Sequence, residues 1–501
     1  MIREERVQSQ LPVGWTKARV DDICDLINGR AFKPSEWASI GIPIIRIQNL
    51  NDPSLEFNYC NFSIEQKFLV DNGQLLFAWS GTPGTSFGAH IWNRGKAALN
   101  QHIFKVNINE KYLDKIFLKH LLNHNIGEYI AKAHGTAGLA HITKGKFEES
   151  QINLPPFNEQ KRIANKIEEL FSFLDVGVES LRKVKAQLKC YRQAVLKYAF
   201  EGKLTEEWRK THKDQIEPAT KLLERIGQAS KNKEQKSPVQ SREKQSSIDL
   251  PELPESWVWT TIGDLIIDAR YGTSKKCYSE PDGVPVLRIP NIVKERLDFT
   301  DLKYTHLSDE EVERISLKFG DILIVRTNGS LEFIGRATTV GEQQNNYTFA
   351  SYLIRLRPVI ADILPRYLVL FLSSEIGRKT IQRRARTTAG QFNINLDALR
   401  SIPIPLSSLT EQEKIIEDID RHFSFVDETE KTMSICIEIS EHLRQSILKV
   451  VFEGKLIPQD PTDEPAEKLL ERIMGERVKQ IKTETRNKND LGQVELVRFV
   501  K

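Results

Sequence analysis

The residues best able to do chemistry in this sequence are a proline-rich segment and a histidine pair. Amino-methyltransferases hold the target amine with a [Asp/Asn/Ser]-Pro-Pro-[Tyr/Phe] loop, and Asn153-Leu-Pro-Pro-Phe157 approaches that pattern. Leu154 interrupts it, and the matching segment Pro403-Ile-Pro-Leu406 has no aromatic residue, so both are predicted to terminate strands. His120 and His124 are spaced for one helix face but lack a third ligand, which predicts surface histidines and no metal site.

Other catalytic signatures do not occur in the sequence. It has neither the Gly-x-Gly-x-x-Gly pattern of a dinucleotide loop nor the Gly-x4-Gly-Lys-[Ser/Thr] pattern of a phosphate loop. Pro281-Asp282 would need a later acid-x-Lys pair to form a nuclease site, and no convincing partner follows. We therefore expect no catalytic residues and no enzyme activity in this chain alone.

Cationic side chains gather in the segment 375–386. Five of its residues are Lys or Arg and one is Glu, so this segment carries +4, as much as the whole chain with its 72 basic and 68 acidic residues. Helical spacing would place Lys379 and Arg383, and also Arg383 and Arg386, on one face. Such a stripe suits DNA phosphates, with a solvated helix face as the alternative. The predicted phosphate contacts are Lys379, Arg383, Arg384 and Arg386.

Polar loops after strands would be the segments that read base sequence if the partner is DNA, because amide, hydroxyl and guanidinium groups match base-edge patterns in the major groove. Two pairs of loops qualify, 79–82 with 326–330 and 135–141 with 387–393; a structural turn is the competing interpretation. The candidate residues are Trp79, Ser80, Thr82, Thr136, His141, Arg326, Thr327, Asn328, Ser330, Thr388, Gln391 and Asn393. Lys144 is a further candidate for DNA contact, from the weaker basic segment of the first copy that holds Lys132, His134, His141, Lys144 and Lys146.

These loops belong to a chain that repeats itself. Leu11-Pro-Val-Gly-Trp15 returns 242 residues later as Leu253-Pro-Glu-Ser-Trp257, and Phe200-Glu-Gly-Lys-Leu204 returns 252 residues later as Phe452-Glu-Gly-Lys-Leu456. A period this long indicates a duplicated domain pair and not a solenoid. The scaffold is similar in both copies while the loops differ, so the two copies are expected to differ in what they bind.

Each copy combines two kinds of periodicity. A β-rich stretch with one helical segment predicts an α+β globule, and an apolar seam then predicts a long helix. The two helices most simply pack as an antiparallel coiled coil with pseudo-two-fold symmetry; a helix packed into its own globule is the alternative. The predicted seam is Ile163, Ile167, Leu170, Leu174, Leu181, Val184, Leu188, Tyr191, Val195 and Tyr198, with Ile415, Ile419, Phe423, Val426, Met433, Ile437, Leu443, Ile447 and Val450.

The expected organisation alternates globules and helices along the chain. Globules are predicted at 1–155 and 251–406. The long helices are predicted at 156–228, with a short following helix, and at 407–457. A flexible linker is predicted at 229–250, and a C-terminal helix and tail at 458–501.

Composition predicts a soluble cytoplasmic protein. Apolar residues make up 40% and charged residues 28%, and no apolar run is long enough to cross a membrane. Residues 1–6 lack the apolar region of a secretory signal. The five cysteines are scattered without a CxxC pair, which fits a reducing compartment.

In this arrangement the chain resembles the specificity subunits of type I restriction–modification systems. The resemblance rests on the Leu-Pro-x-x-Trp openings, on Glu159-Gln-x-x-Ile and Glu411-Gln-x-x-Ile at the helix starts, and on the Phe-Glu-Gly-Lys-Leu ends, and it covers almost the whole chain. It implies two target-recognition domains that read an asymmetric, bipartite site on double-stranded DNA. It also implies two methyltransferase (modification) subunits docked on the helices and two motor-nuclease (restriction) subunits, with S-adenosylmethionine, ATP and Mg²⁺ bound by those partners. The alternative is a coiled-coil assembly scaffold whose globules bind protein partners.

Overall fold

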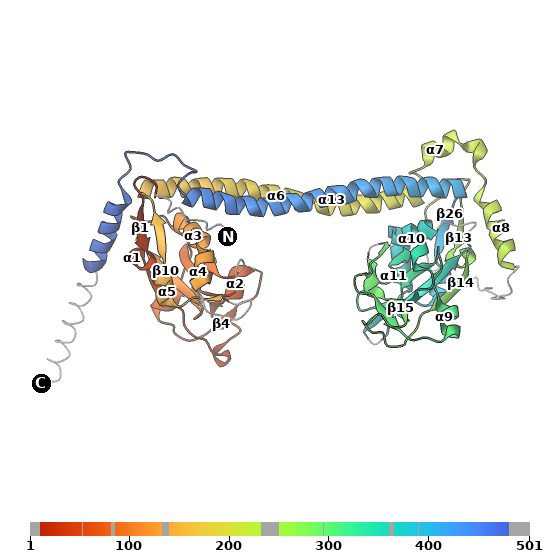
Figure 1. The fold of residues 1–501 in the computed structure, drawn as a ribbon, viewed down its shortest axis with the longest axis horizontal. Coiled ribbons are helices and arrows are strands. Elements are labelled where there is room, and N and C mark those ends of the chain that lie inside the picture. Colours follow the sequence, from red (N-terminus) through yellow and green to blue (C-terminus); the bar gives the residue numbers. More distant parts are fainter. Residues whose placement is uncertain are drawn as a thin grey trace, which may run out of the picture. The chain divides into compact units, whose positions relative to one another are not determined.

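A computed structural model describes residues 11–52, 54–81, 86–132, 140–231, 250–293, 295–359, 365–388 and 390–479. The chain divides into two compact units, one from residues 1–180 and 435–501 and the other from 181–434. Each unit holds one globule and parts of two long helices, α6 (Phe157–Phe200) and α13 (Leu409–Phe452) (Figure 1). The predicted linker falls mainly on 232–249, outside the described residues. In the described ranges no helix is long and apolar enough to span a membrane.

The globule of the first unit alternates short strands and helices. The strands are β1 (Thr16–Arg19), β2 (Cys24–Asn28), β3 (Ile42–Ile45), β4 (Asn58–Cys60), β5 (Leu69–Val70), β6 (Gln74–Ala78), β7 (Ser80–Gly81), β8 (Gly88–Trp92), β9 (Ala97–Leu99), β10 (Ile103–Ile108), β11 (Ala140–His141) and β12 (Gln151–Leu154). The helices are α1 (Val20–Ile23), α2 (Ile47–Asn51), α3 (Lys115–His124), α4 (Ile126–Lys132) and α5 (Lys144–Glu148). The main sheet has the order β2-β10-β6-β8, a second sheet has the order β4-β3-β9-β5, and β1 pairs with β12 and β7 with β11.

The globule of the second unit has the same plan. Its strands are β13 (Val258–Thr261), β14 (Ile266–Tyr271), β15 (Val284–Leu287), β16 (Ile292–Val293), β17 (Arg296–Leu297), β18 (Lys303–Thr305), β19 (Ile322–Val325), β20 (Thr327–Asn328), β21 (Ala337–Thr339), β22 (Thr348–Phe349), β23 (Leu353–Pro358), β24 (Arg386–Thr388), β25 (Gln391–Asn393) and β26 (Pro403–Leu406). Its helices are α9 (Asp309–Ile315), α10 (Pro365–Ser373), α11 (Glu375–Arg384) and α12 (Leu396–Arg400).

Strand order confirms the internal duplication. The main sheet of the second globule runs β14-β23-β19-β21, element for element the counterpart of β2-β10-β6-β8. The pairs β13–β26 and β20–β25 repeat β1–β12 and β7–β11. The predicted α+β class and the two-copy architecture are therefore both confirmed.

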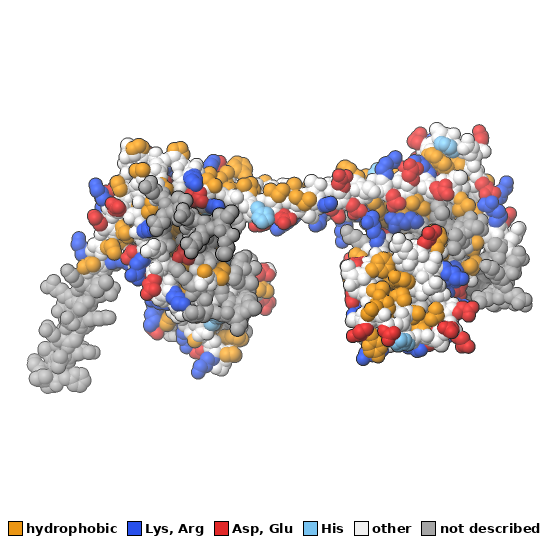
Figure 2. Space-filling model, in the orientation of Figure 1, with side chains coloured by type: hydrophobic (Ala, Val, Ile, Leu, Met, Phe, Trp, Pro, Cys, Tyr) orange, Lys and Arg blue, Asp and Glu red, His pale blue; other side chains and the backbone are white. Residues whose placement is uncertain are grey.

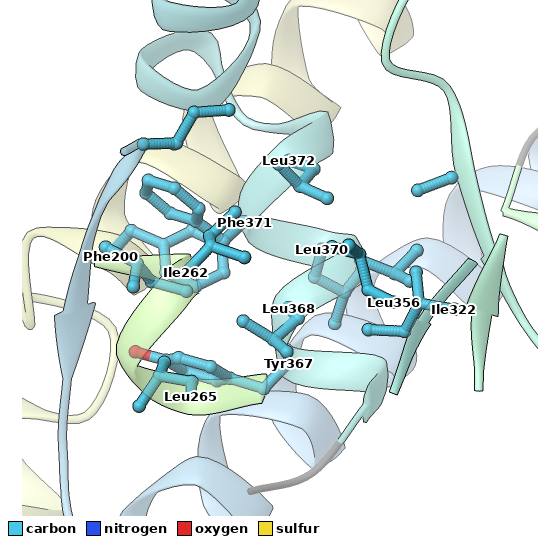
Figure 3. Packing of buried hydrophobic residues seen from close by; sticks show 14 of the residues in the cluster. Phe200, Ile262, Leu265, Ile322, Leu356, Tyr367, Leu368, Leu370, Phe371 and Leu372 are labelled. Carbon is cyan, nitrogen blue, oxygen red and sulfur yellow. The ribbon is translucent and has the colours of Figure 1, made fainter. Parts of the chain in front are cut away.

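A shared aromatic residue ties the end of each long helix into a globule. In the second unit Phe200 of α6 is fully buried against Tyr367 and Phe371 of α10, with ring centroids 5.2 and 5.3 Å apart (Figure 3). Phe452 of α13 occupies the matching place in the first unit, 5.8 Å from Phe117 of α3. Burying one such ring stabilises the fold by about 1.5–3 kcal/mol. The helix of one copy thus contributes to the core of the globule of the other copy.

The two repeated sequence motifs meet at these helix ends. Gly202 and Gly454 end the helices in the left-handed region, with φ of 71° and 68°. A Cβ on Gly202 would lie 2.4 Å from Cγ of Pro254, and one on Gly454 would lie 2.3 Å from Cγ of Pro12. The Phe-Glu-Gly-Lys-Leu turn of each helix therefore packs directly on the Leu-Pro-x-x-Trp opening of a globule, and glycine is needed for both the turn and the close approach.

Short helices after these turns complete each unit. In the second unit α7 (Glu206–Thr211) and α8 (Ala219–Lys231) follow, and the amide of Ala219 donates to the carbonyl of Ser256 over 3.0 Å. In the first unit a helix over 466–479 follows α13, and the amide of Ala466 donates to the carbonyl of Gly14 over 2.9 Å. Both bonds occupy equivalent places in the two copies.

The long helices pack against each other inside each unit. In the second unit Arg192 of α6 pairs with Asp427 of α13 and covers the ring of Phe423 at 4.7 Å. In the first unit Arg444 of α13 pairs with Asp175 of α6 and covers the ring of Phe171 at 4.8 Å. Because the start of one helix lies beside the end of the other in each unit, the two helices run antiparallel, as predicted.

The seam itself differs in part from the predicted one. Val178 and Arg192 turn inward where no seam position was predicted, being 6% exposed and half-buried respectively. A straight helix with 3.6 residues per turn rotates about 20° per heptad away from a seven-residue repeat, so strict heptad positions drift toward solvent. The buried or half-buried predicted residues are Ile163, Ile167, Leu170, Leu174, Leu181, Leu188, Val195, Ile415, Ile419, Phe423, Val426, Met433, Ile437 and Ile447. The prediction is wrong for the exposed residues Val184, Tyr191, Tyr198, Leu443 and Val450.

Candidate nucleic-acid interface

A small three-stranded sheet in the second globule is built from its two predicted loops, 326–330 and 387–393, which are strands over part of their length. Its order is β20-β25-β24. Thr327 and Arg386 both pair with Asn393, from opposite sides of β25. Residues about 60 positions apart in sequence therefore form one continuous polar surface beyond the end of β19.

Arg326 lies at the junction between the main sheet and this small sheet. Its guanidinium group lies 4.4 Å from the ring centroid of Tyr271, at the end of β14, and Nη1 donates to the carbonyl of Ser351 over 3.3 Å. Its backbone amide donates to the carbonyl of Tyr352 over 2.9 Å. In the described part of the chain its buried Nε has no hydrogen-bond partner. The side chain is thus held in place yet keeps donor capacity.

The hydroxyl and amide groups of the small sheet are partly used within the protein. The hydroxyl of Thr327 donates to Oδ1 of Asn393, and Nδ2 of Asn393 donates to the carbonyl of Gln391 over 3.3 Å. Oδ1 of Asn328 accepts the backbone amide of Ser330 over 2.9 Å, which is a turn-forming bond. Gln391 and Ser330 are exposed. For Thr388 only the backbone lies within the described residues.

The basic segment precedes this sheet, and the prediction of its helical face needs one correction. Helix α11 ends at Arg384, while Arg386 lies on strand β24, so Arg383 and Arg386 do not share a helix face. The break follows from Ala385, whose extended backbone ends the helix. Lys379 and Arg383 do lie on α11 and are exposed, and Lys379 also pairs with Glu375 over 2.5 Å.

Two arginines of the segment have structural partners. Nη1 of Arg378 donates to the carbonyl of Ile334 over 2.6 Å and Nη2 to that of Glu332 over 2.7 Å, which holds the loop after β20. Arg384 is half-buried, its Nη1 lies 3.5 Å from the carbonyl of Ala398, and burial lowers its pKa. Arg383 and Arg386 are exposed and have no ion-pair partner among the described residues.

The first globule builds the corresponding surface from different residues. Ser80 on β7 pairs with His141 on β11, and their Oγ and Nε2 atoms are 3.5 Å apart. Lys144 opens α5 and lies 3.4 Å from Glu148. The predicted contacts Thr82 and Thr136 lie outside the described residues.

Trp79 is held by the protein more firmly than a free loop residue would be. It is half-buried, and its ring stacks on Phe104 with centroids 5.8 Å apart. Its indole N–H donates to Oδ1 of Asn28 over 3.2 Å and to the carbonyl of Gln101 over 3.1 Å. Its ring also contacts two imidazoles, those of His102 and His141, with centroids 5.3 and 6.0 Å away.

His102 was not identified from the sequence. Nε2 of its ring lies 3.1 Å from Nε2 of Gln101, so this ring nitrogen is engaged within the protein. Nδ1 is buried without a hydrogen-bond partner in the described ranges. Burial lowers the pKa of His102, and neighbouring His141 adds to this effect. Both ring nitrogens are therefore turned toward the protein, one against Gln101 and the other buried. The only sequence signal for His102 is the internal repeat, in which His102 of the first copy aligns with Tyr352 of the second.

The two candidate chemical groups considered first are structural. Leu154 is buried on β12 opposite Thr16, so the Pro-Pro segment ends a strand, as predicted. The prediction that His120 is a surface residue is wrong: it is 4% exposed and its Nε2 lies 2.6 Å from Glu168 of α6. His124 packs on Phe452, with ring centroids 4.9 Å apart. Both histidines lie on α3, and each contacts a long helix: His120 contacts α6 and His124 contacts α13.

Comparisons with known proteins agree with this architecture. The family model of the type I restriction modification DNA specificity domain matches residues 12–186 and 254–438. The type I restriction enzyme EcoKI specificity subunit of Escherichia coli K12 is 28% identical over 491 residues, covering 93% of this chain and 96% of that protein. The EcoBI specificity subunit of Escherichia coli is 27% identical over 492 residues, covering 95% of each. A solved chain from work on complex assembly and conformational transition of the type I R-M system has a TM-score of 0.61 and 17% identity, covering 89% of this chain and 100% of that one.

Proposed function

Because this chain belongs to the family of type I restriction–modification DNA specificity subunits, we propose that it reads an asymmetric, bipartite target on double-stranded DNA, one half with each globule. The observation that carries the proposal is the duplicated surface at the end of the main sheet. Trp79 directly follows β6, and Arg326 directly follows the equivalent strand β19. His141 and Asn393 are also equivalent, because they pair with the next residues, Ser80 and Thr327. One scaffold with two sets of side chains fits two different half-sites.

The chemistry of each surface suits base recognition. In the second globule the Arg326 guanidinium can donate two hydrogen bonds to guanine, while Asn393 and Gln391 carry amides that match adenine. In the first globule the corresponding surface carries the hydroxyl group of Ser80 and the imidazole of His141 instead. Arg383 and Arg386 supply phosphate contacts, which position the protein without reading sequence.

In this proposal the chain is a non-catalytic subunit of a cytoplasmic DNA adenine methyltransferase and endonuclease complex. Two methyltransferase subunits bind S-adenosylmethionine, and two motor-nuclease subunits bind ATP and Mg²⁺. Hydrophobic side chains are exposed along the long helices (Figure 2). Phe173 and Phe425 are 70% and 64% exposed at equivalent positions of the two copies, which supports docking of two copies of one partner, the methyltransferase subunit.

Selection of bound duplexes from a randomised pool by the full chain tests this function. We expect a split motif with two dissimilar halves, and affinity that falls steeply with salt. A chain that selects no motif and binds without salt dependence would instead be a scaffold for protein partners. Methyl transfer from labelled S-adenosylmethionine by the purified chain alone would contradict the non-catalytic role.

A further inference from the structure

The surface around Trp79 and Arg326 has a further element that neither loop pair contains. The short turn at 100–102 leads into β10, and the turn at 350–352 leads into β23. In both globules the backbone amide of the central residue donates into this turn: Trp79 to the carbonyl of His102 over 3.2 Å, and Arg326 to that of Tyr352 over 2.9 Å.

The side chains of the central residues make the same connection. The indole N–H of Trp79 donates to the carbonyl of Gln101, and Nη1 of Arg326 donates to the carbonyl of Ser351. Although tryptophan and arginine share no chemistry beyond an N–H donor, each is anchored to the same backbone position of the turn. The turn is therefore an invariant part of the architecture whose side chains are free to differ.

A second corner comes from the end of the neighbouring strand. Asn28 ends β2 opposite Phe104, and Tyr271 ends β14 opposite Ile354, so the two residues are equivalent. Asn28 accepts the indole N–H of Trp79, and Tyr271 lies beneath the guanidinium of Arg326. Because β10 runs antiparallel to its neighbours β2 and β6, the ends of β2 and β6 lie beside the start of β10. This brings the side chains together at one end of the main sheet.

Three of the four side chains at these corners are exposed, and the fourth, His102, is half-buried. Tyr352 is 56% exposed and Tyr271 36% exposed, and Asn28 is exposed as well. Exposed aromatic rings beside a guanidinium group offer thymine methyl groups in the major groove a contact surface. His102 is half-buried and its Nε2 contacts Gln101, so its ring adds contact surface rather than a free hydrogen-bonding pair.

We propose that His102 in the first globule and Tyr352 in the second are specificity-determining residues that contact the DNA bases, with Asn28 and Tyr271 beside them. This inference rests on the proposed function. It adds the turns at 100–102 and 350–352 to the reading surface of each globule. It also explains why the same backbone framework carries an imidazole in one copy and a phenol in the other.

The experiment compares motifs selected from randomised duplexes by the full chain and by its His102→Ala and Tyr352→Ala variants. Tyr352→Ala should lower base discrimination about 5- to 150-fold at one or two positions of one half-site and leave the other half-site intact. His102→Ala should do the reverse. Phe319→Ala is the matched control, because Phe319 is 50% exposed at the opposite end of β19 from Arg326, and both half-sites should survive.

Two results would overturn the inference: unchanged discrimination in both variants, or loss of both half-sites together with a lower unfolding temperature, which would make the turns structural. If the wild-type chain selects no motif, the proposed function itself fails. Failure of the inference alone leaves a wild-type split motif that the two substitutions do not alter.

Discussion

Replacing Arg383 and Arg386 together should weaken DNA binding without changing sequence preference. Of the five cationic residues in the basic segment, Arg378 and Arg384 donate to protein carbonyls and Lys379 pairs with Glu375. Arg383 and Arg386 remain exposed. They are therefore the two residues of the segment expected to neutralise phosphates.

The magnitude follows from counterion release. Each phosphate contact contributes about 0.9 to the slope of log K against log salt, so the Arg383→Ala/Arg386→Ala variant should lose about 1.8 units of slope. Taking 1 M salt as the point where this electrostatic contribution vanishes, affinity should fall about 60-fold at 0.1 M and about 20-fold at 0.2 M. The fall should be nearly equal for target and non-target duplexes.

Fluorescence anisotropy with labelled duplexes across a salt series measures both quantities. Arg384→Gln is the control, since it removes one charge from the same helix but from a half-buried side chain, and its slope should change by less than about half a unit. An unchanged slope in the double variant would refute the phosphate assignment. An equal change in the control would show that overall charge, and not these two side chains, governs binding.

Three further changes test the packing and docking arguments. Glu411 is fully buried and accepts hydrogen bonds from Trp257, Thr205 and Arg209, so Glu411→Gln should destabilise the second unit by about 3 kcal/mol in urea denaturation. The equivalent Glu159, whose pKa is raised by burial, accepts a hydrogen bond from Trp15. Glu159→Gln should lower the free energy of unfolding by less than about 1 kcal/mol, because an amide oxygen still accepts this bond. Equal losses of unfolding free energy in the two variants would contradict this asymmetry. Burial lowers the pKa of His120, so the folded chain binds this proton less readily than the unfolded chain. The contribution of this group to the free energy of unfolding should therefore be full above about pH 6.5 and fall below it. His120→Gln should lessen that fall in unfolding curves measured between pH 7.5 and 5.5. An unaltered pH dependence would count against a buried neutral ring. Phe173→Asp and Phe425→Asp should each lower the amount of methyltransferase subunit that co-purifies with the chain. The control Ile40→Asp, at a 77% exposed site in the first globule, should leave that amount unchanged. Undiminished co-purification with both phenylalanine variants would place the docking surface elsewhere.

The duplicated architecture could be predicted from the sequence because its signals are local and occur twice. Proline after β12 and glycine after each long helix mark boundaries through backbone restrictions that do not depend on tertiary contacts. The prediction that Pro403 and Pro405 end a strand is wrong, because both lie within β26 and pair with β13. The exchange of helix ends between copies was not predicted. In the sequence Phe200 and Phe452 only mark the ends of the long helices, and packing shows which globule buries them.

The candidate site divides in the same way. Arg326, Thr327 and Asn393 could be proposed because each belongs to a polar segment predicted as a loop, although Thr327 and Asn393 lie on the short strands β20 and β25. Arg386 was assigned to a helix because continuous basic spacing does not reveal where a helix ends. His102 and Tyr352 were missed because they lie before strands, and strand pairing with distant segments brings them to the surface around Trp79 and Arg326.

The most direct test of the central claim is the methylation motif that this chain specifies. The chain is expressed with its methyltransferase subunits in a host lacking other adenine methylation, and N6-methyladenine is mapped by single-molecule sequencing. The account predicts modified sites with two dissimilar half-sites separated by a constant number of unspecified base pairs. A continuous motif, two identical half-sites, or no motif from an active methyltransferase complex would contradict it.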